Sequence, residues 1–171
     1  MDVQILKATT KDIPVLLELG RKTFKETYGK DNSTRDMDLY LRENFTLTRI
    51  AKEMNSRLAS FFIIYENGIA VSYTKIRIHR KWNQKCMEIE TLYVLESEIG
   101  KGYGKELMSH SLEIAHEKKV RTVWAQVWGA KINSGLKAIE FYKQWGFMPF
   151  GKAVFRLGNS LQDDILMKKE L

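Results

Sequence analysis

A glycine-rich segment between an apolar run and an amphipathic run carries the clearest chemical signal in the sequence. Gly100, Gly102 and Gly104 alternate there, and Lys101 and Lys105 stand beside them. Glycines at alternate positions let backbone N–H groups approach an anion closely, and a helix N-terminus adds unpaired donors and partial positive charge. The spacing therefore predicts a cradle for a pyrophosphate group. A loop that needs glycine only to make its turn is the alternative.

Two common nucleotide-binding motifs do not fit this segment. A Walker loop ends in Gly-Lys-Ser/Thr, whereas Gly104-Lys105 is followed by Glu106. A dinucleotide fingerprint places its third glycine where Lys105 stands. The predicted pyrophosphate must therefore belong to another kind of ligand.

Two motifs together resemble the GNAT family of acetyltransferases. The Gly-x-Gly at 102–104, after a strand that ends Leu-Tyr-Val at 92–94, is similar to the family's acetyl-coenzyme-A pyrophosphate loop. Ile99 replaces the Gln or Arg that usually begins that loop. The run Ala-Ile-Glu-Phe-Tyr-Lys-Gln-Trp-Gly-Phe at 138–147 is similar to the family's Ala-x-x-Phe-Tyr-x-x-x-Gly-Phe. Two motifs in the right order are far more specific than either one alone.

The N-terminal half resembles one branch of that family, the PaiA-type polyamine acetyltransferases. The residues that carry this resemblance are Thr23-Phe24, Thr27-Tyr28, Asn32-Ser33, Asp36-Met37, Tyr40-Leu41, Phe45 and Ser60-Phe61-Phe62. The stretch from Gly129 to Lys137 departs from the pattern because it is a few residues longer. Gly135 stands where the family has a coenzyme-contacting Asn, and Asn133 is taken as its substitute.

The resemblance implies an acetyl-coenzyme-A (acetyl-CoA)-dependent N-acetyltransferase that uses no metal. It implies direct attack of a primary amine on the thioester in a ternary complex, with a polyamine such as spermidine or spermine as the acceptor. Backbone groups at 92–94 would hold the pantetheine arm and stabilise the oxyanion, and a β-bulge would free them from the sheet. The expected coenzyme-binding residues are Leu92, Tyr93, Val94, Gly100, Lys101, Gly102, Tyr103, Gly104, Lys105, Asn133 and Lys143.

Tyr142 is the candidate general acid, because its phenol could protonate the departing thiolate. Its helical spacing alone favours an ordinary core tyrosine. The resemblance reverses that preference and assigns Tyr142 a catalytic role.

Glu88 and Glu90 are the candidate carboxylates for handling the amine. Side chains alternate along a strand, so both are expected on one face, together with Leu92 and Val94. Such a pair could attract an ammonium group and relay its proton through water. An ion pair with the basic stretch at 75–85, itself expected to be a solvated hairpin end, fits nearly as well.

The acceptor is less clearly indicated than the reaction. Candidate acidic residues for holding a polycation are Asp31, Asp36, Asp38, Glu43 and Glu53. Their stretch also carries Lys and Arg residues, and the whole chain has a formal net charge of +7, so charge does not identify the acceptor. The alternatives are another amine (a protein N-terminus, a lysine or an amino-sugar) and a non-catalytic acetyl-CoA sensor.

Other chemistry has little support. Cys86, the one cysteine, lies in a predicted strand and is expected to be a buried, inert thiol. His79, His110 and His116 lack the spacing of metal ligands, so no metal site is expected. No helix-turn-helix or zinc-finger pattern indicates a nucleic-acid partner.

Length and composition predict one domain over residues 1–171. Hydrophobic residues make up 44% and charged residues 29%, as in a globular protein. No apolar run could span a bilayer, and the N-terminus lacks a signal-peptide pattern. Together with the lone cysteine, this gives the expectation of a cytoplasmic protein without a membrane partner. The oligomeric state is left open, with a homodimer among the options.

Hydrophobic periodicity predicts the elements that position these groups. Strands are expected at residues 3–8, 60–66, 69–78, 86–95, 122–128, 147–157 and 161–169, with a tight turn at Asn67-Gly68. Helices are expected from about residue 10, from about residue 34, at 45–55, at 102–118 and up to about residue 145. The alternation implies an α/β (α+β) fold, a mixed sheet with helices on its faces. The GNAT resemblance adds that the sheet is mostly antiparallel.

Overall fold

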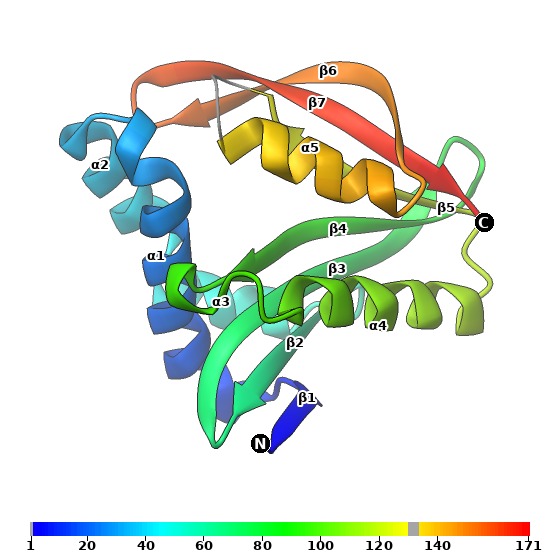
Figure 1. The fold of residues 1–171 in the computed structure, drawn as a ribbon, viewed down its shortest axis with the longest axis horizontal. Helices are drawn as coiled ribbons and strands as arrows, with labels where there is room; N and C mark the ends of the chain where they lie inside the picture. Colours follow the sequence, from blue (N-terminus) through cyan, green and yellow to red (C-terminus); the bar gives the residue numbers. More distant parts are fainter. Residues whose placement is uncertain (1, 130–133) are drawn as a thin grey trace.

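Seven strands form one sheet in the computed structural model, which describes residues 2–129 and 134–171. The strands are β1 (Val3–Lys7), β2 (Ala59–Glu66), β3 (Ile69–Lys81), β4 (Gln84–Val94), β5 (Thr122–Trp128), β6 (Met148–Leu157) and β7 (Ser160–Glu170). Their order in the sheet is β1-β2-β3-β4-β5-β7-β6, so a hairpin made of β6 and β7 completes one edge (Figure 1).

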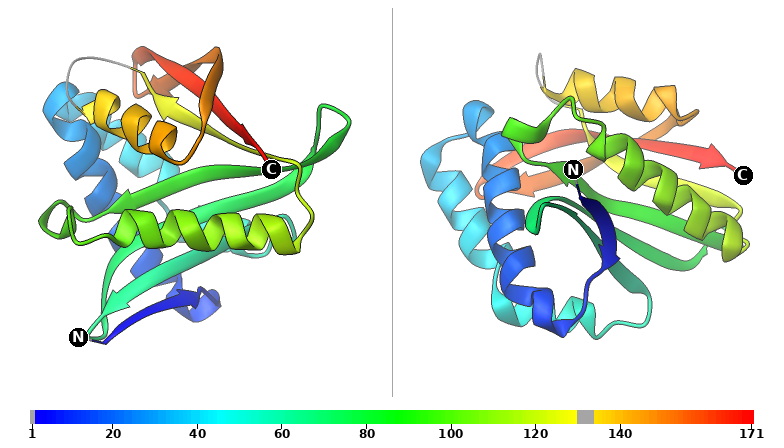
Figure 2. Two further views of the ribbon diagram at one scale, coloured as in Figure 1. Left: turned by 45° about the vertical axis from the view of Figure 1, so that its right-hand side comes forward. Right: turned by 60° about the horizontal axis from the view of Figure 1, so that its bottom comes forward.

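Helices cover both faces of this sheet (Figures 1 and 2). They are α1 (Ile13–Tyr28), α2 (Thr34–Asn44), α3 (Leu47–Met54), α4 (Tyr103–Glu117) and α5 (Ser134–Gln144). The neighbours Ile63 and Ile64 of β2 are both 0% exposed, because Ile63 packs with Leu16 of α1 and Ile64 packs with Leu107 of α4. This confirms the prediction that the run at 60–66, apolar on both faces, is an interior strand.

The parallel pairing of β4 with β5 is the exception in an otherwise antiparallel sheet. The two strands are connected through α4, and their ladder is short. It runs from Cys86 opposite Thr122 to Glu88 opposite Trp124. Both strands continue beyond this point without further pairing to each other. The sheet therefore divides in its middle, where one edge of each strand has no strand partner.

The predicted order of elements and the mixed, mostly antiparallel sheet with helices on both faces are confirmed. Asn67 and Gly68 have φ angles of 49° and 78°, as the predicted tight turn requires. Ser33 caps α2 by accepting a hydrogen bond from the Asp36 N–H at 3.1 Å. Among the described residues, no helix combines the length and apolar character needed to cross a bilayer.

The turn between β6 and β7 packs closely against α2, and substitutions at glycine can test how tight this contact is. Gly158 in this turn has a φ of 59°, and a Cβ there would lie 2.6 Å from Asp36 Cα. Gly68 has a φ of 78° but open space around it. We expect Gly158→Ala to lower the free energy of unfolding by about 2–4 kcal/mol and Gly68→Ala by only about 1 kcal/mol. Urea unfolding measures both, and equal losses would contradict a tight contact with α2.

Candidate active site

The division between β4 and β5 leaves a small pocket of about 80 Å³. We call it the split pocket and define it by Ile89–Tyr93 of β4, Gln126–Trp128 of β5, Tyr28 of α1, and Ala138 and Tyr142 of α5. It therefore gathers the predicted acid, one predicted carboxylate and the β4 segment that was predicted to hold the pantetheine arm.

A β-bulge in β4 lies directly at this pocket. Ile89 pairs with Ile76 of β3 and Thr91 pairs with Lys75, so Glu90 is the extra residue between them. The bulge predicted near residues 92–94 is thus present two residues earlier. An extra residue bends its strand and increases the local twist, which helps β4 to diverge from β5.

The bulge also changes which face the side chains of β4 occupy. Leu92 and Val94 pack against a cluster that contains Leu107 of α4. Glu88 and Glu90 instead line a pocket on the opposite face, beside α1. The prediction that all four side chains share one face is wrong, because an inserted residue reverses the alternation beyond it.

That second pocket, of about 280 Å³, has aromatic walls, and we call it the aromatic pocket. Its lining residues are Phe24, Tyr28, Tyr40, Phe45, Glu88, Glu90, Thr91, Tyr93, Gln126, Phe155 and Asp164. Among the residues that the structure describes, three carboxylates and no lysine or arginine line it. It adjoins the split pocket, because Tyr28, Glu90 and Tyr93 are among the residues that line both.

The rings of the aromatic pocket support one another. Phe24 lies 4.4 Å from Tyr28 and stacks on Tyr40 at 4.6 Å, measured between ring centroids. The hydroxyls of Tyr28 and Tyr93 share a hydrogen bond of 3.0 Å. Ring faces attract cations, so a cavity of this composition favours a positively charged guest over an anion.

The two predicted carboxylates have different partners. Glu90 forms ion pairs with Lys75 and with Arg77, whose Nε lies 2.5 Å from Glu90 Oε1. Glu88 has no ion pair with any described residue. The ion-pair alternative is therefore correct for Glu90 and not for Glu88.

These surroundings separate the pKa values of the two groups. Burial and, to a smaller extent, the neighbouring negative charge of Glu90 together raise the pKa of Glu88 to about 7. Burial also opposes ionisation of Glu90, but hydrogen bonds from Arg77 and Lys75 outweigh it and hold the pKa below its ordinary value. Near neutral pH, Glu90 is thus a fixed negative charge, whereas Glu88 can both take up and release a proton.

Lys75 connects this cluster to α3. It is 9% exposed and also forms an ion pair with Glu53. The expectation of a solvated hairpin end is therefore wrong for Lys75 and Arg77, which stabilise partly buried carboxylates. Glu53 was predicted to help hold a polycation, but Lys75 neutralises it.

The other acidic residues predicted for a polycation pocket lie outside the aromatic pocket. Asp36 accepts a hydrogen bond from the Asn159 N–H at 2.7 Å, which ties α2 to the β6–β7 turn. Asp31, Asp38 and Glu43 do not line the aromatic pocket either. The acidic groups that line the aromatic pocket come from β4 and β7, so the predicted helical residues do not join them there, and their role in holding a polycation stays a prediction.

Tyr142 lies at the boundary between the core and the split pocket. It is 9% exposed, and its ring centroid lies 5.2 Å from that of Phe147. Burial raises the pKa of its phenol above the ordinary value, so the hydroxyl stays protonated at neutral pH. Tyr142 is thus a core residue with the protonation state that a general acid needs.

The glycine-rich loop has the geometry of an anion cradle. Gly100 and Gly102 have φ angles of 96° and 97°, which favour glycine. Gly102 is the N-cap of α4, and no side chain accepts a hydrogen bond at this end of the helix. The N–H groups of the first turn therefore lack intrahelical partners and remain available to an anion. A Cβ at Gly104 would lie 3.7 Å from Phe141, an ordinary contact, so lack of space does not require glycine there.

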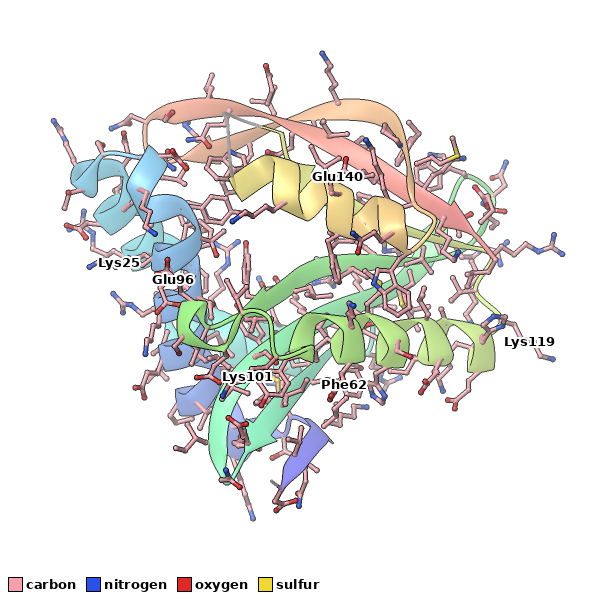
Figure 3. The ribbon with its side chains drawn as sticks, in the orientation of Figure 1. Lys25, Phe62, Glu96, Lys101, Lys119 and Glu140 are labelled. Carbon is pink, nitrogen blue, oxygen red and sulfur yellow. The ribbon has the colours of Figure 1, made fainter. Side chains whose placement is uncertain are left out.

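The side chains expected to assist anion binding at the glycine-rich loop differ in their exposure and in their partners. Lys101, which is labelled in Figure 3, pairs with Glu98 at 2.6 Å and with Glu66 at 3.1 Å, so its charge is already partnered. The Tyr103 ring packs into the core beneath α4, which leaves only its backbone N–H for a ligand. Lys105 is exposed on the first turn of α4.

Lys143 and Asn133 are the two remaining predicted coenzyme contacts. Lys143 is exposed and pairs with Glu140 at 3.1 Å. Asn133 lies outside the described residues.

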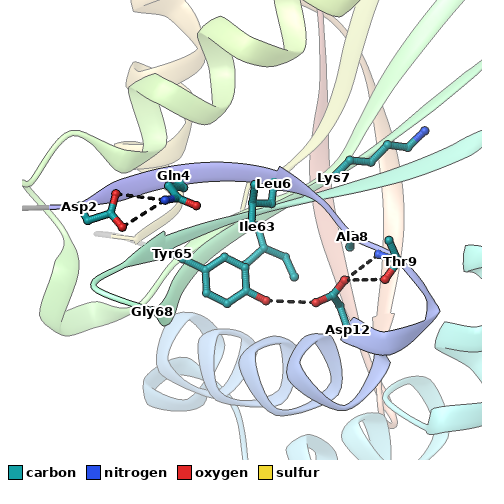
Figure 4. A pocket seen from close by; sticks show the side chains of 10 residues that line it. All are labelled: Asp2, Gln4, Leu6, Lys7, Ala8, Thr9, Asp12, Ile63, Tyr65 and Gly68. Carbon is teal, nitrogen blue, oxygen red and sulfur yellow. Dashed lines mark hydrogen bonds between the residues drawn. The ribbon is translucent and has the colours of Figure 1, made fainter.

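Another pocket, of about 520 Å³, lies away from these groups at the edge strand β1 (Figure 4). Its polar groups are largely paired with one another: Asp12 accepts hydrogen bonds from the Thr9 N–H at 2.7 Å and from the Tyr65 hydroxyl at 3.3 Å. Cys86 is fully buried, and burial raises the pKa of its thiol, as expected for an inert cysteine. The candidate active site therefore consists of the split pocket, the aromatic pocket and the glycine-rich loop.

Four lining residues of the aromatic pocket were not predicted: Thr91, Gln126, Phe155 and Asp164. The adjacent acids Asp163 and Asp164 directly precede the apolar run Ile165-Leu166-Met167, which is a weak signal. Only the observed register shows that Asp164 is buried while Asp163 is exposed.

Comparison with known proteins agrees with this geometry. The model of the Acetyltransferase (GNAT) family matches residues 18–147. An uncharacterized N-acetyltransferase in pepI 3'region of Lactobacillus delbrueckii subsp. lactis is 31% identical and covers 99% of this chain and 98% of its own. A spermidine N(1)-acetyltransferase of Thermoplasma acidophilum is 23% identical over 70% of this chain and 74% of its own. The structure of a PaiA N-acetyltransferase from Thermoplasma acidophilum in complex with coenzyme A has the same fold, with a TM-score of 0.78 over 100% of both chains at 19% identity.

The raised pKa of Glu88 can be tested directly by titration. We expect its carboxyl carbon to titrate near pH 7 in NMR spectra of protein with ¹³C-labelled glutamate. Glu90→Gln should lower this pKa, because it removes a neighbouring negative charge and leaves Lys75 and Arg77 in place. Glu113→Gln, on the exposed side of α4, should leave it unchanged. A Glu88 that titrates at the ordinary value of a glutamate would contradict its burial.

Proposed function

This chain belongs to the GNAT family of acetyltransferases, and on that premise we propose that it transfers the acetyl group of acetyl-CoA to a primary amine of the polyamine class, such as spermidine or spermine. The observation that carries the proposal is the aromatic pocket. It presents ring faces and carboxylates, with no lysine or arginine among its described lining residues, and it adjoins the split pocket. A protonated amine is the guest that this chemistry favours.

The acetyl donor binds across the opposite side of the split. The first turn of α4, with Gly100 and Gly102 before it, fits the pyrophosphate of coenzyme A. The unpaired edge of β4 beyond Glu88 offers backbone groups to the pantetheine arm. The thioester supplies an activated acyl carbon, and the split pocket is the place where that carbon and the amine meet. Holding both reactants there supplies much of the rate enhancement.

Proton transfer is divided between Glu88 and Tyr142. Glu88, with its pKa near 7, takes a proton from the incoming ammonium through water. The free amine attacks the thioester carbon, and a backbone N–H of β4 stabilises the oxyanion. As the C–S bond breaks, Tyr142 gives its phenolic proton to the thiolate. The nitrogen releases its second proton to solvent, solvent returns one to Tyr142, and Glu88 releases the proton that it took to solvent.

The acceptor class has two supports. The pocket chemistry favours a cation, and one relative is named a spermidine N(1)-acetyltransferase, at 23% identity. The net charge of +7 gives no general attraction for a polycation, so the attraction must be local to the pocket. A protein N-terminus, a lysine side chain, an amino-sugar and a sensor without turnover are the outcomes that a test must separate.

Thiol release from acetyl-CoA over an amine panel tests the proposed reaction. The panel contains spermidine, spermine, a peptide with a free N-terminus, a lysine peptide and glucosamine. We expect the highest kcat/KM with a polyamine, and a loss of about 100-fold or more in kcat for Tyr142→Phe, because the variant keeps the ring and loses the acid. A preference for another member of the panel would reject the polyamine class. Coenzyme binding without release from any amine would indicate a sensor.

The role of Glu88 predicts a particular pH profile. The pH-dependence of kcat/KM should contain a step near pH 7, with activity rising as Glu88 becomes ionised, since only the carboxylate can accept a proton. Glu88→Gln should remove this step and lower kcat/KM by about 100-fold. The slower rise toward high pH, which reflects the free amine itself, should remain. Glu113→Gln is the matched control, and a step that persists in Glu88→Gln would assign the base to another group.

A further inference from the structure

Asp164 of β7 has a buried oxygen without a hydrogen-bond partner. The residue is 5% exposed. Its Oδ2 accepts a hydrogen bond from Gln126 Nε2 at 2.8 Å, whereas Oδ1 accepts none from any described residue. A buried carboxylate oxygen that lacks a donor is costly, so such atoms are rare unless a ligand or water completes their hydrogen bonds.

This oxygen belongs to a residue of the aromatic pocket wall. Asp164 lies opposite Trp128 in the ladder between β5 and β7, and it shares the pocket lining with Phe155, Tyr28 and Glu88. Burial raises the pKa of its carboxyl, partly offset by the hydrogen bond from Gln126 and by the nearby Gly129 N–H, which donates to the Asp163 carbonyl at 3.2 Å. A cation beside it would stabilise the ionised form.

The charges of the site leave Asp164 and Glu88 without a cationic partner among the described residues. Lys75 and Arg77 are engaged with Glu90, and Lys75 also with Glu53. Asp164 comes from β7 and Glu88 from β4, with β5 between them in the sheet (Figure 2). Two separated carboxylates in one aromatic cavity complement a guest with two positive nitrogens joined by an apolar spacer.

We propose that Asp164 binds a second nitrogen of the acceptor while the first is acetylated beside Glu88. The inference rests on the proposed acetyl transfer and adds a specificity-determining residue to it. The second ammonium donates a hydrogen bond to Oδ1, and the methylene groups between the nitrogens lie along the rings. A monoamine of the same length leaves Oδ1 without a partner, so the site selects diamines and longer polyamines.

A purely structural role is the competing explanation, since the bond from Gln126 joins β5 to β7. The variant Asp164→Asn distinguishes a structural role of Asp164 from binding of the second nitrogen. The asparagine keeps an oxygen that can accept the Gln126 hydrogen bond, but it removes the negative charge and turns a donor toward the pocket. Asp163→Asn is the matched control, because it makes the same change in charge at the neighbouring, exposed position.

The decisive experiment is calorimetric binding of 1,4-diaminobutane and 1-aminobutane to the protein saturated with coenzyme A. We expect the parent protein to bind the diamine at least about tenfold more tightly than the monoamine, as a charged hydrogen bond in a buried site allows. Asp164→Asn should weaken diamine binding by about 10- to 100-fold and reduce the preference for it. Asp163→Asn should change neither by more than about twofold.

Kinetics with the same amines gives the second readout. Asp164→Asn should raise KM for the diamine far more than it lowers kcat, because Asp164 positions the acceptor and does not transfer protons. Equal affinity of the parent protein for the two amines would overturn the inference, even if the variant failed to fold. Equal effects of Asp164→Asn and Asp163→Asn would also overturn it. Tight, Asp164-dependent diamine binding without thiol release would support it and reject the proposed acetyl transfer.

Discussion

The site depends on the point at which β4 stops pairing with β5. Parallel strands in the middle of a sheet normally satisfy each other's backbone groups along their whole length. Here the ladder ends at Glu88, and the bulge at Glu90 follows at once. The backbone groups that the ladder would have used are left for a ligand, and the space between the strands becomes the split pocket. The same extra residue turns Leu92 toward α4 and leaves Glu88 beside the aromatic pocket.

A second constraint follows from the charge of Glu90. A carboxylate in a bulge at the centre of a sheet would be unstable without a cation. Lys75 and Arg77 on the neighbouring strand meet this need, and Glu53 of α3 balances the additional positive charge. The basic residues of β3 therefore stabilise the site from within. The contrast between Glu90 and Glu88 arises because Lys75 and Arg77 form ion pairs with Glu90 and not with Glu88, so one carboxyl is held ionised and the other titrates near neutrality.

Much of the fold could be predicted because its signals are local. The apolar run of β2, the Asn67-Gly68 turn and the glycines before α4 each specify their own conformation through periodicity or allowed φ angles. The face of the sheet on which each β4 side chain lies could not be predicted in this way. A single inserted residue carries no signature in composition, yet it reverses every side chain that follows.

The acidic lining of the aromatic pocket depends on pairings between distant segments. Asp164 reaches the pocket through its register with Trp128, a contact between residues far apart in the chain. Acidic residues on α2 and α3 were the more visible candidates, but the hydrogen bond from Asn159 occupies Asp36 and the ion pair with Lys75 occupies Glu53. Reading the sequence could identify the kind of chemistry, whereas the choice between rival residues required the tertiary structure.

Most rings of the aromatic pocket come from parts of the chain far from the glycine-rich loop, whereas β4, which precedes that loop, supplies Glu88, Glu90, Thr91 and Tyr93. The rings at 24–45 and 155 and the carboxylate of Asp164 come from the two ends of the sequence, whereas the anion cradle at 100–105 lies in its middle. The two ends meet because the β6–β7 hairpin returns to α1 and α2, where Gln162 bonds to Asn32. Substitutions at the ends can therefore reshape one cavity without disturbing the other. Such a division makes the scaffold modular. Evolution can change the ligand that the aromatic pocket binds without changing the glycine-rich loop, and protein engineering can do the same.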